Sequence, residues 1–299
     1  MQRMPSHALH DPVLTWYDHA RRDLPWRDPS CSPWGVLVSE VMLQQTPVVR
    51  VLPAWRAWLD RWPTPAALAA DRPGEAIRRW DRLGYPRRAL RLHAAATAIV
   101  ERHGGEVPGE HAALLALPGI GGYTASAVAS FAFGQRHAVL DTNVRRVLAR
   151  VVVGDQFPAP TLTTAETSRA LDLLPDEPAV AARWAVAVME LGALVCTART
   201  PRCAECPVLT RCRWTLDGQP PYDGPARRGQ AYAGTDRYVR GLILAVLRAA
   251  DVPVPRARIA AAVPDTTLRD PLQRDRCLDA LVADGLVEPL PRHRFRLPA

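Results

Sequence analysis

The sequence contains no lysine, and all 38 of its basic residues are arginines. Because no side-chain amine is present, the chain cannot form a lysine Schiff base, and lysine-dependent covalent catalysis is excluded. The arginines outnumber the 30 acidic residues and give a net charge of +8. Such a charge suits a polyanionic partner such as nucleic acid, although a basic bias of the whole proteome produces the same excess.

Long apolar runs are also absent. No stretch approaches the roughly 18 residues that a membrane-spanning helix needs, and Met1 to His10 contains no hydrophobic segment typical of a signal peptide. With 299 residues, 48% of them hydrophobic, the chain is long enough for a sizeable core and more than one domain. We therefore expect a cytoplasmic protein without a membrane partner.

Cysteine is scarce and unevenly placed. Cys31 and Cys277 are isolated, whereas a C-x6-C-x2-C-x5-C pattern contains Cys196, Cys203, Cys206 and Cys212. A disulfide framework would be spread through a small secreted chain, so this concentrated set indicates a metal or cluster site in a reducing compartment. Structural zinc sites usually use two close cysteine pairs, and this pattern has one. The spacing therefore favours a [4Fe–4S] cluster over zinc or four unliganded thiols.

Apolar residues at three- and four-residue spacing predict a mainly helical chain. We expect a helix–turn–helix over 114–133 and further helices over 12–22, 36–51 and 168–194. Residues 218–234 are rich in Gly, Pro, Arg and Gln and are predicted to form a linker. Three helical stretches follow, near 239–247, 256–263 and 268–284, and then a hairpin around 291–293. This order is typical of a winged helix.

Three glycines lie in the sequence L-P-G-I-G-G-Y, which spans residues 117–123. Gly119, Gly121 and Gly122 permit a tight turn whose backbone comes close to a partner. The amides at the start of the following helix then point at an anion, and this is how a helical hairpin grips a DNA phosphate. A plain turn between helices needs only one glycine, so the sequence favours phosphate binding.

Two carboxylates stand out. Asp141 follows a short apolar run and is placed to cap the next helix. Asn143, the only asparagine of the chain, is expected either to bind a substrate or to orient Asp141. Glu40 lies among apolar residues, where a carboxyl tends to have a raised pKa that suits a general acid. The alternative is an ordinary glutamate on the surface of an amphipathic helix.

Together these motifs resemble the helix-hairpin-helix DNA glycosylase superfamily with the Gly/Pro-Asp motif, and within it the MutY-type adenine glycosylases. The resemblance covers roughly residues 12–214 and rests on the four-cysteine spacing and on WYDHARRDLPWR, SEVMLQQTPV, LPGIGGYTASAV and VLDTNVRRVLAR. It implies an all-α, two-lobed fold with a [4Fe–4S] cluster loop. A six-helix barrel is expected over 28–134, and a cluster domain over 1–27 and 135–228. A small winged-helix-like domain over 229–299 completes the chain.

The resemblance also implies roles for individual residues. Glu40 protonates the flipped adenine, and Asp141 supports the oxocarbenium ion at the deoxyribose C1′. Tyr123 and Asn143 match residues that line the same pocket. The residues expected to contact DNA are Leu43, Gln45 and Val48 near the 8-oxoguanine, Tyr85 at an intercalating position, and the hairpin glycines Gly119, Gly121 and Gly122.

Related enzymes differ at two of these positions. Endonuclease III-type enzymes have a lysine after the hairpin where this chain has Tyr123, so hydrolysis without a lysine lyase step is expected. Thymine-mismatch glycosylases also have a tyrosine there but lack the glutamate that matches Glu40, which favours adenine. The expected activity is excision of adenine mispaired with 8-oxoguanine or guanine in duplex DNA, by a monomer associated with the nucleoid. A glycosylase for another base, such as thymine opposite guanine, and a catalytically idle cluster-bearing DNA-binding protein are the alternatives.

The sequence departs from the MutY pattern in three places. Thr142 stands where glycine is common, and Pro86 stands where a second tyrosine is common. Residues 235–299 are too few for the Nudix-like domain that usually ends these proteins, and they contain no Phe-Ser-His loop. The tail is expected either to touch DNA or to serve as a packing or protein-contact module.

Overall fold

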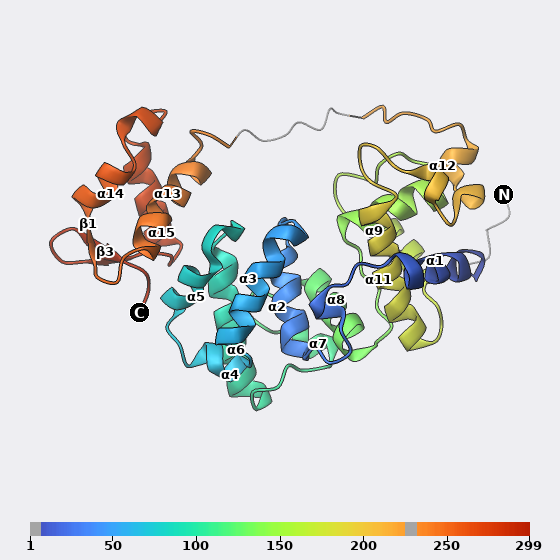
Figure 1. Ribbon diagram of the computed structural model, residues 1–299, viewed down its shortest axis with the longest axis horizontal. Coiled ribbons are helices and arrows are strands. Elements are labelled where there is room, and N and C mark those ends of the chain that lie inside the picture. Colours follow the sequence, from blue (N-terminus) through green and yellow to red (C-terminus); the bar gives the residue numbers. More distant parts are fainter. Residues whose placement is uncertain (1–6, 225–231) are drawn as a thin grey trace. The chain divides into compact units, whose positions relative to one another are not determined.

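The computed structural model describes residues 7–224 and 232–299, which form two compact units (Figure 1). One unit comprises residues 7–37, 108–116 and 121–224, and the other comprises residues 38–107, 117–120 and 232–299. Helix α2 (Pro33–Leu43) begins in the first unit and ends in the second. The predicted domain limits at 27/28 and 134/135 stay predictions. The limit at 228/229 and the middle of the predicted linker lie outside the described residues.

The first unit is helical. A core formed by α1, α9 and α11 contains buried residues such as Val13, Val147 and Leu191. Short 3-10 turns lie at Pro25–Arg27, Cys203–Glu205 and Leu209–Arg211, and a π-helical turn lies at Ala149–Val153. The α-helices are α1 (His7–Ala20), α7 (His111–Leu115), α8 (Gly122–Phe133), α9 (Thr142–Leu148), α10 (Thr164–Asp172), α11 (Pro178–Leu194) and α12 (Arg213–Leu216).

The second unit contains a helical part and a C-terminal part. The helical part comprises the end of α2, α3 (Val48–Arg61), α4 (Pro65–Ala69), α5 (Pro73–Trp80), a 3-10 turn (Asp81–Leu83) and α6 (Arg87–His103). Three tryptophans form its centre: the ring centroid of Trp58 lies 4.6 Å from that of Trp62 and 5.6 Å from that of Trp80. All three are almost fully buried. Edge-to-face aromatic packing of this kind adds to the stabilisation from area burial alone.

Residues 232–299, here called the C-terminal module, combine helices with a small sheet. Its elements are α13 (Asp236–Arg248), β1 (Val254–Pro255), α14 (Arg256–Ala262), a 3-10 turn (Asp265–Thr267), α15 (Gln273–Ala283), β2 (Glu288–Leu290) and β3 (Arg294–Arg296). The strands are antiparallel in the order β1-β3-β2, and Phe295 pairs with both Val254 and Pro289. The predicted winged-helix order is confirmed, and the short strand β1 is an addition that the sequence did not indicate.

Local sequence signals set several helix ends. Thr163 and Glu166 form a reciprocal capping box at the start of α10, and Pro73 and Pro178 occupy first-turn positions of α5 and α11. Helix α6 ends at Gly104, whose φ of +63° lies in the left-handed region that favours glycine. These signals are local, so they act independently of the rest of the fold.

Two helices predicted to be continuous are each interrupted in the structure. The helix predicted over 36–51 is interrupted, because α2 ends at Leu43 and α3 begins at Val48. Pro47 disfavours helical geometry in the residue before it, and Gln45 has a φ of +56°. The helix predicted over 168–194 is divided into α10 and α11, which are separated by residues 173–177. Within residues 7–224 and 232–299, no helix is both long and apolar enough to cross a membrane.

Candidate active site

Asp141 lies at the N-terminus of α9 and caps that helix. Its Oδ1 accepts a hydrogen bond from the backbone N–H of Val144 at 2.6 Å, and its Oδ2 accepts one from Nδ2 of Asn143 at 2.8 Å. Burial raises the pKa of the Asp141 carboxyl, and these hydrogen bonds partly oppose that rise. The predicted cap is confirmed, and Asn143 orients the carboxylate. The result is a partly desolvated anion held in one orientation.

Asn143 is itself held by Arg146. Nη2 of Arg146 donates to Oδ1 of Asn143 at 2.8 Å, and Nε donates to the carbonyl of Cys196 at 2.7 Å. The guanidinium of Arg150, one helical turn further on, donates to Sγ of Cys196 at 3.4 Å. A continuous chain of hydrogen bonds therefore joins the Asp141 carboxylate to the first residue of the four-cysteine motif.

Gly192 of α11 permits this close packing. A Cβ atom added to Gly192 would lie 2.7 Å from Cβ of Asn143 and 2.8 Å from its carbonyl oxygen. The carbonyl of Gly192 also accepts a hydrogen bond from Nη2 of Arg146 at 2.6 Å. Helix α11 can therefore approach Asn143 at this position only without a side chain.

The cysteines of the motif line one shared cavity. The four thiols that line it are those of Cys196, Cys203, Cys206 and Cys212. The remaining lining residues are apolar, apart from Arg150 and Thr215. Among the described residues, no three His, Cys, Asp or Glu side chains converge closely enough to bind one metal ion. Four thiols around one cavity suit a group with four separate corners, so the donor set fits an iron–sulfur cube. Burial raises the pKa of the Cys206 thiol to about 11, and bound iron would deprotonate it.

Glu40 lies on α2 and is only 5% exposed. Its neighbours Ser39, Val41 and Met42 are buried as well. The structure thus buries this residue and does not place it on the exposed face of an amphipathic helix. A buried carboxyl is the kind of group that serves as a general acid near neutral pH.

Arg88 holds together the two turns expected to contact DNA. Its guanidinium donates to the carbonyl of Gln44 at 2.6 Å, to Oγ1 of Thr46 at 3.0 Å and to the carbonyl of Gly84 at 3.0 Å. Arg88 is 5% exposed, and burial lowers the pKa of its guanidinium to about 10. This single buried side chain therefore joins the segment after α2 to the segment before α6.

Each of these turns contains a residue with unusual backbone geometry. Gln45 has a φ of +56° and Tyr85 a φ of +47°, a region that costs a residue other than glycine about 1–3 kcal/mol. Both side chains are exposed, and Leu43 and Val48 beside them are half-buried. Such backbone strain persists only where the surrounding structure imposes it, and strained residues are typical of functional sites.

The hairpin glycines differ in what surrounds them. Gly119 has a φ of +74°, and a Cβ there would lie 2.6 Å from Cβ of Arg91. Added Cβ atoms at Gly121 and Gly122 would meet nothing within 4 Å. Gly121 caps α8 without a side-chain hydrogen bond, so a partner's oxygen can come close to the first turn of the helix. Tyr123, in that first turn, packs against the buried cluster formed by Ala127, Val139 and Ala185.

Residues 38–172 match the HhH-GPD family, described as HhH-GPD superfamily base excision DNA repair protein. The adenine DNA glycosylase of Mycobacterium tuberculosis is 52% identical over 294 residues, which are 98% of this chain and 95% of that protein. The chain belongs to the HhH-GPD superfamily. The adenine DNA glycosylase of Mycolicibacterium smegmatis is 53% identical over 285 residues, which are 95% of this chain and 94% of that protein.

A solved structure supports the membership of the HhH-GPD superfamily. The structure of a thermostable thymine-DNA glycosylase matches with a TM-score of 0.64 and 26% identity, and covers 71% of this chain and 97% of that one. The predicted mostly α-helical HhH-GPD fold is confirmed, and so is the assignment of the chain as a DNA glycosylase. The matches to the mycobacterial proteins extend over nearly the whole length, so the C-terminal module is part of what they share.

Sequence reasoning missed several residues that support this HhH-GPD site. Arg146 is three residues after Asn143, a helical spacing that places both on one face. A lone glycine in the apolar run before Cys196 was a signal for close packing at Gly192. Arg88 gave no such signal, because an arginine near the start of an amphipathic helix is usually exposed.

Proposed function

We propose that this HhH-GPD protein hydrolyses the N-glycosidic bond of adenine mispaired with 8-oxoguanine or guanine in duplex DNA. The observation that carries the proposal is the Asp141 carboxylate, which is oriented by Val144 and Asn143 and partly desolvated. An anion of this kind stabilises positive charge better in a low-dielectric site than in water. The names of the two mycobacterial relatives support adenine as the base.

The reaction begins when the target nucleotide leaves the base stack, which costs a few kcal/mol in duplex DNA. Glu40 donates its proton to the leaving adenine, and the electrons of the bond between C1′ and the base go to that base. The carboxylate of Asp141 stabilises the oxocarbenium ion that remains on the deoxyribose. Water then adds to C1′ and loses a proton, which restores the carboxyl of Glu40, and an abasic site remains. Because the chain has no lysine, no side-chain amine is available to cleave the strand.

The proposal includes a [4Fe–4S] cluster held by Cys196, Cys203, Cys206 and Cys212. A bound cluster would hold the loop that carries these cysteines in one conformation. The carbonyl of Cys196 is joined to Asp141 by the hydrogen bonds of Arg146 and Asn143. Replacing Cys203 with serine is expected to lower the iron content from about four atoms per chain. Full iron content in that variant would contradict the ligand assignment.

The first test is a panel of duplexes that pair adenine with 8-oxoguanine, guanine or cytosine, and thymine with guanine. The protein is expected to release adenine from the duplexes in which 8-oxoguanine or guanine lies opposite the adenine. Glu40→Gln should bind these duplexes yet release adenine at least about 100-fold more slowly, the usual contribution of a general acid. Glu101→Gln, which changes an exposed glutamate on α6, is the matched control.

Three outcomes would contradict parts of the proposal. Release of thymine and not adenine would favour the thymine activity of the structural neighbour. Full activity of Glu40→Gln would remove Glu40 from its role as the acid. A DNA adduct trapped by borohydride at a side chain would contradict hydrolysis without a lyase step.

A further inference from the structure

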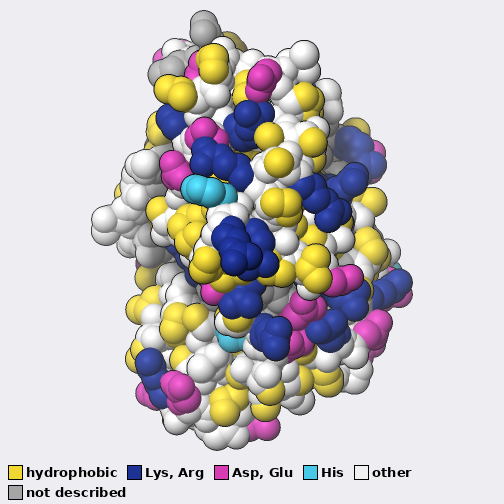
Figure 2. All heavy atoms as spheres, turned by 90° about the vertical axis from the view of Figure 1, so that its left-hand side faces the viewer, with side chains coloured by type: hydrophobic (Ala, Val, Ile, Leu, Met, Phe, Trp, Pro, Cys, Tyr) yellow, Lys and Arg dark blue, Asp and Glu magenta, His cyan; other side chains and the backbone are white. Residues whose placement is uncertain are grey.

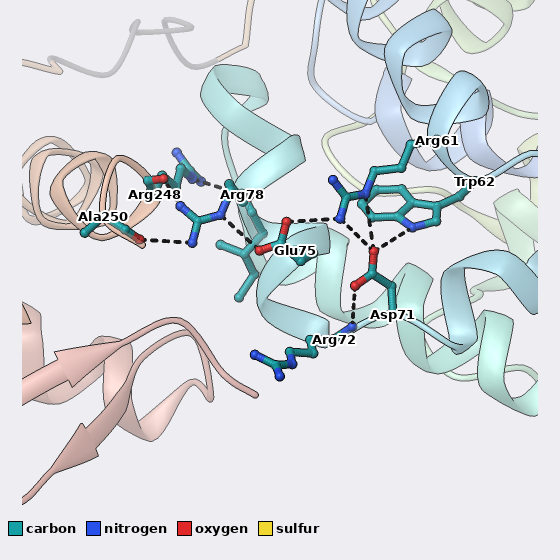
Figure 3. Close-up of polar contacts among 9 residues, drawn as sticks. Arg61, Trp62, Asp71, Arg72, Glu75, Arg78, Arg248 and Ala250 are labelled. Carbon is teal, nitrogen blue, oxygen red and sulfur yellow. Dashed lines mark hydrogen bonds and ion pairs between the residues drawn. The ribbon is translucent and has the colours of Figure 1, made fainter. Parts of the chain in front are cut away.

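Reciprocal hydrogen bonds anchor the C-terminal module to α5 (Figure 3). Arg78 of α5 donates to the carbonyls of Arg248 and Ala250, the latter at 3.1 Å. Nε of Arg248 donates back to the carbonyl of Ile77 at 3.0 Å. Glu75 accepts a hydrogen bond from Nε of Arg78 at 3.1 Å and fixes its guanidinium. Hydrogen bonds from charged donors are stronger than neutral ones, so this attachment holds the module firmly.

The residues that follow β3 contact the start of α5. The N–H of Gly74 donates to the carbonyl of Pro298 at 2.9 Å. A Cβ atom on Gly74 would lie only 2.4 Å from that oxygen, so this contact requires a glycine. At Gly74, the module and α5 therefore meet backbone to backbone.

A second set of contacts reaches the start of α6. Nη2 of Arg87 lies 2.8 Å from Oδ1 of Asp284, and Arg240 of α13 pairs with the other oxygen of the same carboxylate. A Cβ atom added to Gly285 would lie 4.0 Å from Cδ1 of Leu90. The residues after α15, which Arg240 of α13 holds in place, thus contact the start of α6 shortly after Tyr85.

Tyr85 itself is in contact with Arg237 of α13. The guanidinium carbon of Arg237 lies 4.3 Å from the centroid of the Tyr85 ring, well within cation–π range. Both side chains remain exposed, and 39% of Tyr85 is accessible. Arg237 also lies close to Gly84, where an added Cβ would be 3.6 Å from its Nη2. The strained conformation of Tyr85 is therefore supported from the module at the ring.

The helix α15 of the module offers little charge to DNA. Helix-turn-helix proteins insert a recognition helix into the major groove. Figure 2 shows arginine side chains over much of one face, with acidic side chains beside several of them. Three arginines on or near α15 are paired with carboxylates: Arg274 with Asp265, Arg276 with Asp270, and Arg256 with Asp275, at 2.7–2.9 Å. Arg237 of α13, by contrast, is exposed and lies against the Tyr85 ring.

We propose that Arg237 is a positioning residue that acts through Tyr85 and sets the preference for the base opposite the target adenine. This inference rests on the proposed function. The guanidinium stacks on the ring of Tyr85 and so supports the residue in its strained backbone conformation. Because the opposite bases differ in the edges that they present, a fixed orientation of the Tyr85 ring favours one of them over another. The short C-terminal module thereby takes part in reading the opposite base.

A double-mutant cycle on the full-length protein tests this. Arg237→Ala, Tyr85→Leu and the double variant are compared by single-turnover adenine release from duplexes with 8-oxoguanine, guanine or cytosine opposite. Binding of the same duplexes is measured with each change placed in Glu40→Gln. We expect Arg237→Ala to change the preference between opposite bases by about two- to fivefold, the effect of one exposed cation–π contact. In the Tyr85→Leu background the same change should have no further effect.

Arg258→Ala is the matched control, since it removes an equal charge from the exposed face of α14. Equal weakening on all three duplexes by both arginine changes, with a shallower salt dependence, would show a phosphate contact alone and overturn the inference. Additive effects of Arg237→Ala and Tyr85→Leu, or a parent without preference among the duplexes, would overturn it too. A parent that releases no adenine refutes the proposed function, while its binding preferences still decide the role of Arg237.

Discussion

Glu190 is the buried carboxylate through which α11 holds the N-terminal segment, and its replacement should have a measurable cost. It is fully buried and accepts hydrogen bonds from the backbone N–H and Nε of Arg22 and from Nη2 of Arg27, at 2.7–2.9 Å. Burial alone would raise the pKa of Glu190, but these donors outweigh it and hold the pKa at about 2 instead of 4.5. A difference of about 2.5 pKa units corresponds to roughly 3 kcal/mol of unfolding free energy.

The sign of the pH dependence follows from the lowered pKa. The stabilisation by Glu190 is fully present above about pH 4.5, where the unfolded carboxyl is ionised, and is lost as the pH falls toward about 2. Glu190→Gln should therefore lower the unfolding free energy by about 3 kcal/mol at neutral pH. The difference from the parent should shrink progressively below about pH 4.5.

Urea unfolding followed by tryptophan fluorescence at several pH values measures this difference. Glu101→Gln, at an exposed position of α6, should change the unfolding free energy by less than about 0.5 kcal/mol. A loss in Glu190→Gln that is the same at about pH 3 as at about pH 7 would refute the ion-pair reasoning. A loss below about 1 kcal/mol at neutral pH would refute the magnitude.

Three further predictions concern the support of Asp141. Arg146→Met removes the hydrogen bond to Asn143 and should slow single-turnover base release about tenfold or more, with the helical circular dichroism retained. Asn143→Ala removes a hydrogen bond that lowers the pKa of Asp141, so the acid limb of the pH–rate profile should move to higher pH; an unmoved limb would contradict this. Gly192→Ala places a methyl group 2.7 Å from Asn143 and should cost about 1–3 kcal/mol of stability, measured by urea unfolding.

Features that depend on neighbouring residues could be predicted from the sequence. The cap formed by Asp141 needs only a short polar side chain before a helix, and the winged-helix order follows from helical periodicity and a turn. The break between α2 and α3 was missed because an apolar helical pattern continues through Pro47. Proline signals a boundary, but periodicity alone does not show which turn it ends.

Contacts between distant residues could not be predicted in this way. Arg88 binds carbonyls more than forty residues earlier in the chain, and Arg237 meets a ring about 150 residues before it. Neither arginine is distinguished by composition or spacing from the other arginines of the chain. The sequence could identify Glu40 as a candidate acid, but only the structure shows that its neighbours on α2 are buried with it.

The buried guanidinium of Arg88 has a consequence for how the protein can change. Because one side chain binds both the turn at Gln44–Thr46 and the turn at Leu83–Gly84, neither turn can shift without disturbing the other. Substitutions in these two segments should therefore be strongly epistatic, although they are far apart in the sequence. A variant selected for a new base preference would therefore need compatible substitutions in both turns at the same time.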